Sequence, residues 1–322
     1  MRPAAVLVTG VSGFVGSALC ARLVERGYRV RGATRSASTH GLLPPSVQPV
    51  VIGDIGPQTD WTFAVEGVDA VVHLAARVHM LRDTATDPFA DYQRINVEGT
   101  RSLAVAALRA GVRRFIFLSS AKVHGERSVR PFQADDEPAP ADAYAVSKLA
   151  AERALQQALA GSATQWTIVR PPLVYGPGVR ANFLRLMSAV MRGVPLPLGA
   201  IENRRSLIYL GNLVDALLAC IERTGAEGRT FLVSDGEDLS TPELVRRLAA
   251  ALGRPARLLP IPVAVLRLAG FLTGKSAALN RLVDSLQVDS TAIRTALNWA
   301  PPYGVDQGLA ETARWYSLSG GA

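Results

Sequence analysis

A glycine-rich turn near the amino terminus constrains the fold of this chain more than any other feature. Gly10, Gly13 and Gly16 follow an apolar run typical of a buried strand, residues 4–8, and open a helix-like run, residues 14–26. Gly10 permits a tight turn, Gly13 lets a pyrophosphate approach backbone N–H groups, and Gly16 lets helix and strand pack closely. The turn therefore predicts a βαβ unit whose helix amino terminus binds the phosphates of a dinucleotide.

Strand-like and helix-like segments alternate through the first half of the chain. Continuous apolar strands separated by helices indicate a parallel sheet covered on both faces. We therefore expect an α/β fold with a doubly wound parallel Rossmann sheet and a smaller C-terminal substrate lobe. The expected strands after the first are residues 30–34, 47–52, 70–74, 115–119 and 166–169, and the expected helices include residues 88–110 and 143–159.

The pattern loosens after Tyr175, where prolines interrupt the regular segments. We expect a dinucleotide-binding Rossmann domain over residues 1–175 and a substrate-binding lobe over residues 176–322. Residues 213–233 are expected to return to the sheet of the first domain.

Composition excludes several classes of protein. Apolar residues make up 48% and charged residues 19%, which suits a globular protein with a sizeable core. The two cysteines, Cys20 and Cys220, lie in apolar helix-like runs, which predicts buried free thiols and a cytoplasmic location. No cleavable signal and no membrane span is expected. The net charge of +8 comes from scattered Arg rather than a basic block, so nucleic acid is not an expected partner.

A Tyr and a Lys share one face of the expected helix over residues 143–159. Tyr144 and Lys148 are four positions apart, so a Lys148 ammonium is expected to stabilise the Tyr144 phenolate and lower its pKa. Tyr144 could then exchange a proton with a carbonyl–alcohol pair while hydride moves. Ser120 follows the strand over residues 115–119, where it can bond the same oxygen. A surface Lys and a turn-capping Ser are the purely structural alternatives.

These motifs, in this order, resemble those of the extended short-chain dehydrogenase/reductases, specifically the NAD-dependent epimerase/dehydratase family. The G-x-x-G-x-x-G spacing of the first turn matches the version found there. The resemblance implies an NAD(P)-dependent enzyme with Ser120, Tyr144 and Lys148 as catalytic residues. The matching segments are residues 9–16, 53–55, 73–76, 96–100, 119–125, 144–148 and 170–178.

The residues and the resemblance together give an expected cofactor site. By the resemblance, Asp54 and Ile55 lie against adenine, Asn96 orders a turn beside the cofactor, and the stretch after Pro171 covers the nicotinamide. The full expected set is Gly10, Gly13, Phe14, Val15, Gly16, Thr34, Arg35, Asp54, Ile55, Leu74, Ala75, Ala76, Asn96, Tyr144, Lys148, Pro171 and Val174.

The end of the second strand bears on the choice of cofactor. Thr34 stands where a carboxylate would hold the adenosine ribose of NAD, and Arg35 follows it. A guanidinium without that carboxylate favours the 2′-phosphate, so NADP(H) is expected over NAD(H). The alternative is that Arg35 stacks on adenine or points to solvent. No metal is expected, because His40, His73, His79 and His124 lack metal-ligand spacing.

The second half of the chain bears on the substrate. By the resemblance, Arg205 and Asn182 meet the diphosphate of a nucleotide sugar, for which a guanidinium fork is well shaped. A surface Arg and a helix-capping Asn are the alternatives. Ala121 and Lys122 stand where dehydratases carry Asp-Glu, so dehydratase activity is not expected.

The leading expectation is an enzyme that moves hydride at C4 of a UDP-hexose, namely a UDP-4-keto-6-deoxy-N-acetylhexosamine 4-reductase of surface-polysaccharide synthesis. The first alternative is a UDP-hexose or UDP-N-acetylhexosamine 4-epimerase. Further alternatives are a 3β-hydroxysteroid or dihydroflavonol-type ketone reductase and a non-catalytic NADP-sensing module. A UDP-sugar is the expected partner, and a homodimer is one expected assembly.

Overall fold

The largest element of the protein is a seven-stranded sheet in the order β3-β2-β1-β4-β5-β6-β9. The structure is a computed structural model that describes residues 5–78 and 87–320. Every neighbouring pair of strands in this sheet is parallel, which confirms the expected doubly wound α/β fold. The strands are β1 (Ala5–Thr9), β2 (Arg29–Thr34), β3 (Val47–Val51), β4 (Ala70–His73), β5 (Arg114–Leu118), β6 (Gln165–Arg170) and β9 (Arg229–Leu232).

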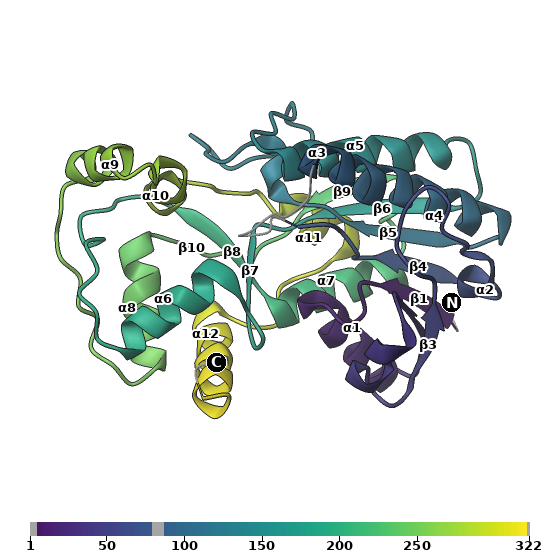
Figure 1. The fold of residues 1–322 in the computed structure, drawn as a ribbon, viewed down its shortest axis with the longest axis horizontal. Coiled ribbons are helices and arrows are strands. Elements are labelled where there is room, and N and C mark those ends of the chain that lie inside the picture. Colours follow the sequence, from purple (N-terminus) through teal and green to yellow (C-terminus); the bar gives the residue numbers. More distant parts are fainter. Residues whose placement is uncertain (1–4, 79–86, 321–322) are drawn as a thin grey trace.

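Helices cover both faces of this sheet (Figure 1). One face carries α1 (Phe14–Glu25), α7 (Leu210–Glu222) and α11 (Thr291–Leu297), and the other carries α2 (Thr62–Val65), α4 (Gly99–Arg109) and α5 (Ala143–Ala158). Alternate side chains of β1 face opposite layers, so Val6 and Val8 pack with α1 and α7 while Leu7 packs with α4 and α5. Burial on both faces explains why the central strands β1 and β4 are almost continuously apolar instead of alternating with polar residues.

The expected helix over residues 88–110 is present but irregular. α3 (Pro88–Tyr92) leads into a π-helical turn, η2 (Gln93–Glu98), before α4 begins. Asn96 lies inside this turn, and its carbonyl oxygen accepts a hydrogen bond from the Thr100 hydroxyl at 2.6 Å. Apolar periodicity does not reveal a π turn, because the turn changes the spacing by a single residue.

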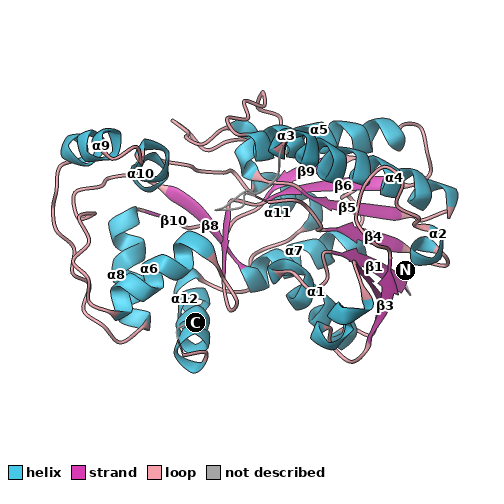
Figure 2. Ribbon diagram, in the orientation of Figure 1, coloured by secondary structure: helices cyan, strands magenta, loops and turns pink. Residues whose placement is uncertain are grey.

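A second, smaller sheet in the order β10-β8-β7 begins the other lobe (Figure 2). After β8 the chain returns to the large sheet, where α7 packs against α1 and β9 pairs with β6. Residues 284–288 then join the lobes, since Leu286 bridges to Arg205 and Val288 bridges to Phe132. The remaining elements are η1 (Ala37–Leu42), β7 (Leu173–Tyr175), α6 (Ala181–Met191), β8 (Arg205–Tyr209), β10 (Asp238–Leu239), α8 (Thr241–Ala251) and α12 (Val305–Leu318).

Two short helices, α9 (Val263–Leu272) and α10 (Ser276–Val283), lie at the end of the smaller lobe farthest from the large sheet (Figure 1). They pack on each other where Gly270 meets Leu279, since a Cβ on Gly270 would lie 2.9 Å from a Leu279 methyl group. Within residues 5–78 and 87–320, no helix is both long and apolar enough to cross a membrane.

The close packing of α1 on the turn before it gives a stability prediction. A Cβ at Gly16 would overlap the Gly10 carbonyl oxygen, whereas a Cβ at Gly41 would meet no heavy atom. We expect Gly16→Ala to lower the free energy of unfolding by about 1–3 kcal/mol, because the turn must shift to make room. Urea unfolding of the two variants measures the difference. Equal stability of Gly16→Ala and Gly41→Ala would contradict this packing argument.

Candidate active site

The parallel sheet gathers the predicted cofactor residues along its carboxyl edge, because parallel strands all end at the same side. Ser120 follows β5 at this edge, whereas Asn96 comes from η2 and both Tyr144 and Lys148 come from α5. The residues at strand ends are Gly10, Gly13, Phe14, Val15 and Gly16 after β1, Thr34 and Arg35 at β2, Asp54 and Ile55 after β3, Leu74, Ala75 and Ala76 after β4, and Pro171 after β6, whereas Val174 lies within β7 of the smaller sheet.

The turn after β1 has a shape that suits a pyrophosphate. Gly10 has a φ of +69°, and a Cβ there would also lie 2.9 Å from the Ala75 backbone nitrogen. Gly13 is the N-cap of α1, and no side chain caps this helix. The N–H groups of the first turn therefore remain available to an anion. These residues fit the pyrophosphate of a dinucleotide.

A buried histidine connects the ends of β1 and β4 to α4. The Thr9 hydroxyl lies 2.6 Å from His73 Nδ1, and His73 Nε2 lies 3.0 Å from the Thr100 hydroxyl. Thr100 donates its own proton to the Asn96 carbonyl, so it must accept from Nε2, and the imidazole is the neutral Nε2–H tautomer. Burial, and secondarily the charge of Lys148, lower the pKa of His73 to about 3, which agrees with this assignment.

Asn96 extends this chain of hydrogen bonds to the helix that carries Tyr144. Its side-chain oxygen accepts from the Arg77 N–H at 2.7 Å, and its nitrogen donates to the Arg77 carbonyl at 3.0 Å. The same nitrogen donates to the Ser147 hydroxyl at 2.9 Å, and Ser147 donates to the Tyr144 carbonyl at 2.8 Å. Asn96 therefore holds both the strand-end turn after β4 and the first turns of α5.

The electrostatic environment of Tyr144 differs from the expectation. Burial, followed by the charge of Asp142 and the neighbouring Tyr92, raises the pKa of Tyr144 above its usual value. Lys148 is itself buried, with its ammonium 3.9 Å from the centre of the Phe117 ring, and burial lowers its pKa to about 7. The expected lowering of the Tyr144 pKa by Lys148 is therefore not seen, because desolvation of both groups dominates in the ligand-free protein.

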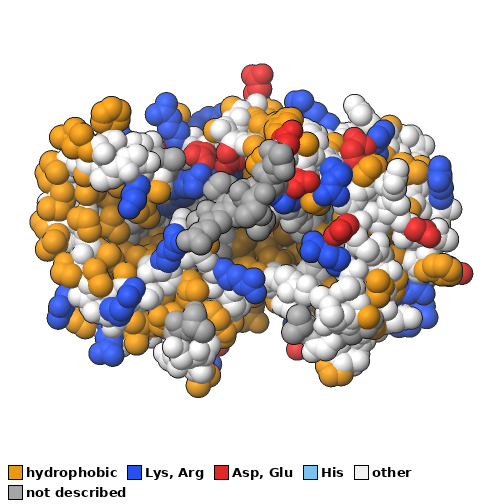
Figure 3. Space-filling view, in the orientation of Figure 1, with side chains coloured by type: hydrophobic (Ala, Val, Ile, Leu, Met, Phe, Trp, Pro, Cys, Tyr) orange, Lys and Arg blue, Asp and Glu red, His pale blue; other side chains and the backbone are white. Residues whose placement is uncertain are grey.

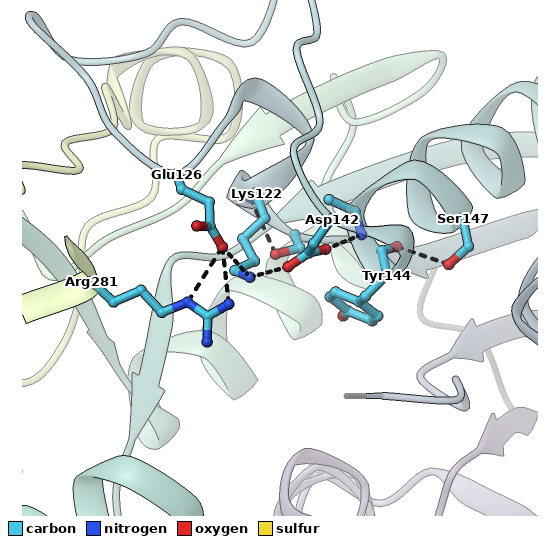
Figure 4. A network of polar contacts seen from close by, with 8 residues as sticks. Lys122, Glu126, Asp142, Tyr144, Ser147 and Arg281 are labelled. Carbon is cyan, nitrogen blue, oxygen red and sulfur yellow. Dashed lines mark hydrogen bonds and ion pairs between the residues drawn. The ribbon is translucent and has the colours of Figure 1, made fainter. Parts of the chain in front are cut away.

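An ionic network lies beside Tyr144 at the junction of the two lobes (Figure 4). Lys122, on the short helix η3 (Ala121–His124), donates to Glu126 at 2.9 Å and to Asp142 at 2.5 Å. Asp142 is the N-cap of α5 and also accepts from the Ala145 N–H at 2.7 Å. Arg281 of α10 reaches the same Glu126 carboxylate at 3.3 Å. The network joins the smaller lobe to the start of the helix that carries Tyr144.

A buried ion pair fixes α5 against β6. Arg170 donates to both Glu152 oxygens, at 3.0 and 2.5 Å, and to His124 Nε2 at 2.8 Å. The His124 ring also stacks on Phe132, with ring centres 5.3 Å apart. Burial, and then the charge of Arg170, lower the pKa of His124 to about 4, so the imidazole is neutral beside the guanidinium.

The two residues predicted to bind the substrate lie on different elements, Asn182 on α6 and Arg205 on β8. Arg205 lies at the start of β8, partly buried, and donates to the Asp284 carbonyl at 2.9 Å. Burial lowers its pKa, while the charges of Asp284 and Glu126 act in the opposite direction. Asn182 is exposed on the first turn of α6, and among the described residues no hydrogen bond joins its side chain to Arg205, Ser120 or Tyr144.

Metal ligands do not cluster in the part of the chain that the structure describes. Over residues 5–78 and 87–320, no group of three His, Cys, Asp or Glu could hold a metal ion. His73 and His124 are each engaged in the hydrogen bonds given above. His79 lies outside the described residues.

Several positioning residues were missed by the sequence analysis, namely Thr9, Thr100, Glu152 and the cluster around Lys122. The pairing of Glu152 with Arg170 joins residues 18 positions apart on different elements, and such pairs leave no local pattern. The N-cap role of Asp142 does have a signal, because an Asp stands directly before the helix that begins at Ala143.

The chain is similar to known proteins along nearly its whole length. Residues 6–234 match the NAD dependent epimerase/dehydratase family. A Vibrio cholerae protein named UDP-glucose 4-epimerase is 42% identical over 318 residues, covering 97% of this chain and 95% of that protein. An Escherichia coli O157:H7 protein named N-acetyl-alpha-D-glucosaminyl-diphospho-ditrans,octacis-undecaprenol 4-epimerase is 30% identical, covering 96% and 94%. The solved structure of MoeE5 in complex with UDP-glucose and NAD matches with a TM-score of 0.77 at 28% identity, covering 98% of this chain and 99% of MoeE5.

The expected preference for NADP(H) over NAD(H) is wrong. MoeE5, which matches this chain over its whole length, is in complex with NAD. The structure supplies a physical reason, because the Arg35 Nε lies 2.8 Å from Asp54 Oδ1. A guanidinium that is paired with a carboxylate presents less positive charge to a 2′-phosphate. Thr34 is buried, with its hydroxyl 3.4 Å from the Val50 carbonyl of the next strand.

The neutral state of His124 gives a pH prediction. Its pKa of about 4 in the folded protein lies below the ordinary value of 6.5, so the unfolded chain binds more protons between these pH values. Folding stability therefore rises with pH across this window and is lost on acidification from pH 6.5 toward pH 4. We expect His124→Gln to reduce this slope by up to about 1.4 kcal/mol per pH unit, while His73 still contributes. Urea unfolding at a series of pH values measures both slopes, and identical slopes would refute the prediction.

Proposed function

Because this chain belongs to the NAD-dependent epimerase/dehydratase family, we propose that it is a UDP-hexose 4-epimerase that uses NAD. The observation that carries the proposal is the likeness along nearly the full length to a protein named UDP-glucose 4-epimerase, at 42% identity. The complex of MoeE5 with UDP-glucose and NAD supports both the substrate class and the cofactor. The 4-reductase expected from the sequence is less well supported, because the relatives named above are epimerases.

Epimerisation at C4 removes a hydride from carbon and a proton from the C4 hydroxyl, and then returns both, with the hydride arriving at the opposite face of the ring. NAD, when bound, would supply the hydride acceptor and donor. The glycine turn, Asp54, Ile55 and residues 74–76 are proposed to hold it along the carboxyl edge of the sheet. We assign the proton to the Tyr144 hydroxyl, with Ser120 bonding the same C4 oxygen.

The pKa values of the site bear on this proton transfer. Tyr144 is protonated at neutral pH in the ligand-free protein, since burial raises its pKa. To take the proton from the C4 hydroxyl, Tyr144 must be ionised when the substrate is bound, and a positive charge beside it favours that phenolate. The phenolate accepts the C4 hydroxyl proton in the first half-reaction, and the resulting phenol returns it to the C4 oxygen in the second. Lys148, with a pKa of about 7, is the residue we propose for that charge. The bonds from Asn96 and Ser147 would keep the Tyr144 backbone in place during both half-reactions.

The substrate diphosphate is assigned to the smaller lobe. We propose that Arg205 of β8 binds it, together with Asn182 of α6. We also propose that residues 1–175 bind the cofactor, that residues 176–322 bind the substrate, and that the protein assembles as a homodimer.

A sugar carried on a lipid diphosphate is the second candidate substrate. The Escherichia coli relative is named as acting on such a molecule, and it is 30% identical over 96% of this chain. The diphosphate is common to both candidates, so Arg205 would serve either one.

The function is tested with the purified protein and UDP-glucose. We expect UDP-galactose to form without net oxidation or reduction of NAD, because the hydride returns to the same carbon. Tyr144→Phe should lower kcat by about 10²–10⁴-fold, since it removes the proton-transfer group. Tyr316→Phe is the matched control, because Tyr316 is buried in α12 and its hydroxyl has no hydrogen bond to any of the described residues. Stoichiometric oxidation of NADH or NADPH by a UDP-4-keto-6-deoxy-N-acetylhexosamine, with no UDP-galactose formed, would favour the reductase instead.

The assignment of the diphosphate is tested by calorimetry with UDP alone. Arg205→Ala should weaken UDP binding by about ten-fold or more, because a charge-assisted bond is lost. Arg204→Ala is the control, since Arg204 is the adjacent cation but is exposed. NAD affinity should be unchanged in both variants. If Arg204→Ala and Arg205→Ala bind UDP equally well, the diphosphate lies elsewhere.

A further inference from the structure

Helix α9 exposes an almost entirely apolar surface. Its outward side chains Val265, Leu268, Phe271 and Leu272 are 53%, 59%, 74% and 74% exposed. They recur at intervals of three and four residues and therefore share one face of the helix. A contiguous apolar face of this kind on a protein surface marks a binding site more often than chance exposure.

The outward face of α9 contributes nothing to the core of the lobe. The helix packs inward through Leu266, which belongs to the same cluster as Val245 and Val283, and through Gly270 against α10. These contacts account for how α9 is held in place. The exposed residues on its other side are therefore not explained by folding.

The surroundings of this face are positively charged. Residues 254–283 contain four Arg and one Lys but no Asp or Glu. Arg267 pairs with Asp284 and Arg281 with Glu126, whereas no carboxylate among the described residues pairs with Arg254, Arg257 or Lys275. Figure 3 shows the same arrangement, with orange side chains gathered at the left end, blue ones around them and no red ones at that end of this face.

We propose that α9 and its flanking cations dock this protein on the surface of a lipid bilayer that contains anionic lipids. A short apolar face rimmed by Lys and Arg is the combination that lies in the boundary between headgroups and acyl chains. The apolar side chains would enter this boundary, and Arg254, Arg257 and Lys275 would meet lipid phosphates. The helix is ten residues long, so it would lie along the surface.

A second copy of the chain is a poorer occupant of this face. In a two-fold contact the same patch meets itself, so the cations of residues 254–283 would face one another with no acidic residue of that segment between them. Like charges brought together in this way oppose association. An anionic bilayer supplies the opposite charge and an apolar interior together.

The proposal is tested by sedimentation with vesicles, which requires no substrate and so does not depend on the proposed activity. The full-length protein should cosediment with vesicles of phosphatidylglycerol and phosphatidylethanolamine, less with phosphatidylcholine, and less as salt is raised. Phe271→Ser combined with Leu272→Ser should weaken binding by roughly ten-fold or more, because the apolar anchor is lost. Lys275→Glu should weaken binding to the anionic vesicles only.

Phe63→Ser is the matched control, because Phe63 of α2 is also 74% exposed and lies at the opposite end of the molecule (Figure 1). It should leave vesicle binding unchanged, and thermal unfolding should show that every variant is folded. The proposal is overturned if the wild type does not sediment with anionic vesicles, or if Phe63→Ser loses as much binding as the double variant. It is also overturned if analytical ultracentrifugation shows that the double variant separates a dimer while vesicle binding is unchanged.

Discussion

The hydrogen bonds from Thr9 through His73 and Thr100 to Asn96 join the glycine turn to the helix that carries Tyr144 and Lys148. A neutral imidazole can accept from one hydroxyl and donate to another, which a charged one cannot, and burial keeps His73 neutral. Asn96 then donates a hydrogen bond to the Ser147 hydroxyl, which fixes α5 relative to the other three residues. The glycine turn and the proposed proton-transfer residue are thereby held in one frame, although α1 and α5 lie on opposite faces of the sheet. Asn96 reaches this junction from a π-helical turn, a local departure from regular α-helix.

Periodic and local features of the sequence predict the fold. Alternating apolar strands and helices, with the glycine turn between the first pair, are enough to predict the parallel sheet and the edge where the candidate site lies. Properties that depend on partners distant in sequence are not predicted by such features. Arg35 is indistinguishable from a phosphate ligand until Asp54 is seen beside it. The pKa of Tyr144 depends on how deeply the helix is buried, and the spacing of Tyr144 and Lys148 says nothing about that depth.

Charge is distributed unevenly along the chain, although no continuous block of basic residues marks the uneven region. Cations are interspersed along residues 254–283 among apolar residues, so no run of like charges forms, yet acidic residues are absent from the whole stretch. The acidic partners that do reach this region come from outside it, as Glu126 does for Arg281. That contact continues through Lys122 to Asp142 at the start of α5. A short series of ion pairs thus connects the surface at α9 and α10 to the candidate active site.

The return of α7 and β9 to the large sheet has a consequence for biosynthesis. The sheet is completed by β9 (Arg229–Leu232), and the face of β1 that carries Val6 and Val8 is covered in part by α7. A nascent chain that has emerged only as far as β6 therefore lacks both its last strand and a large part of one covering layer. The apolar surface of the first strands therefore stays partly uncovered until residue 232 of 322 has been made. Such surface is open to chaperones and to misassembly during this period.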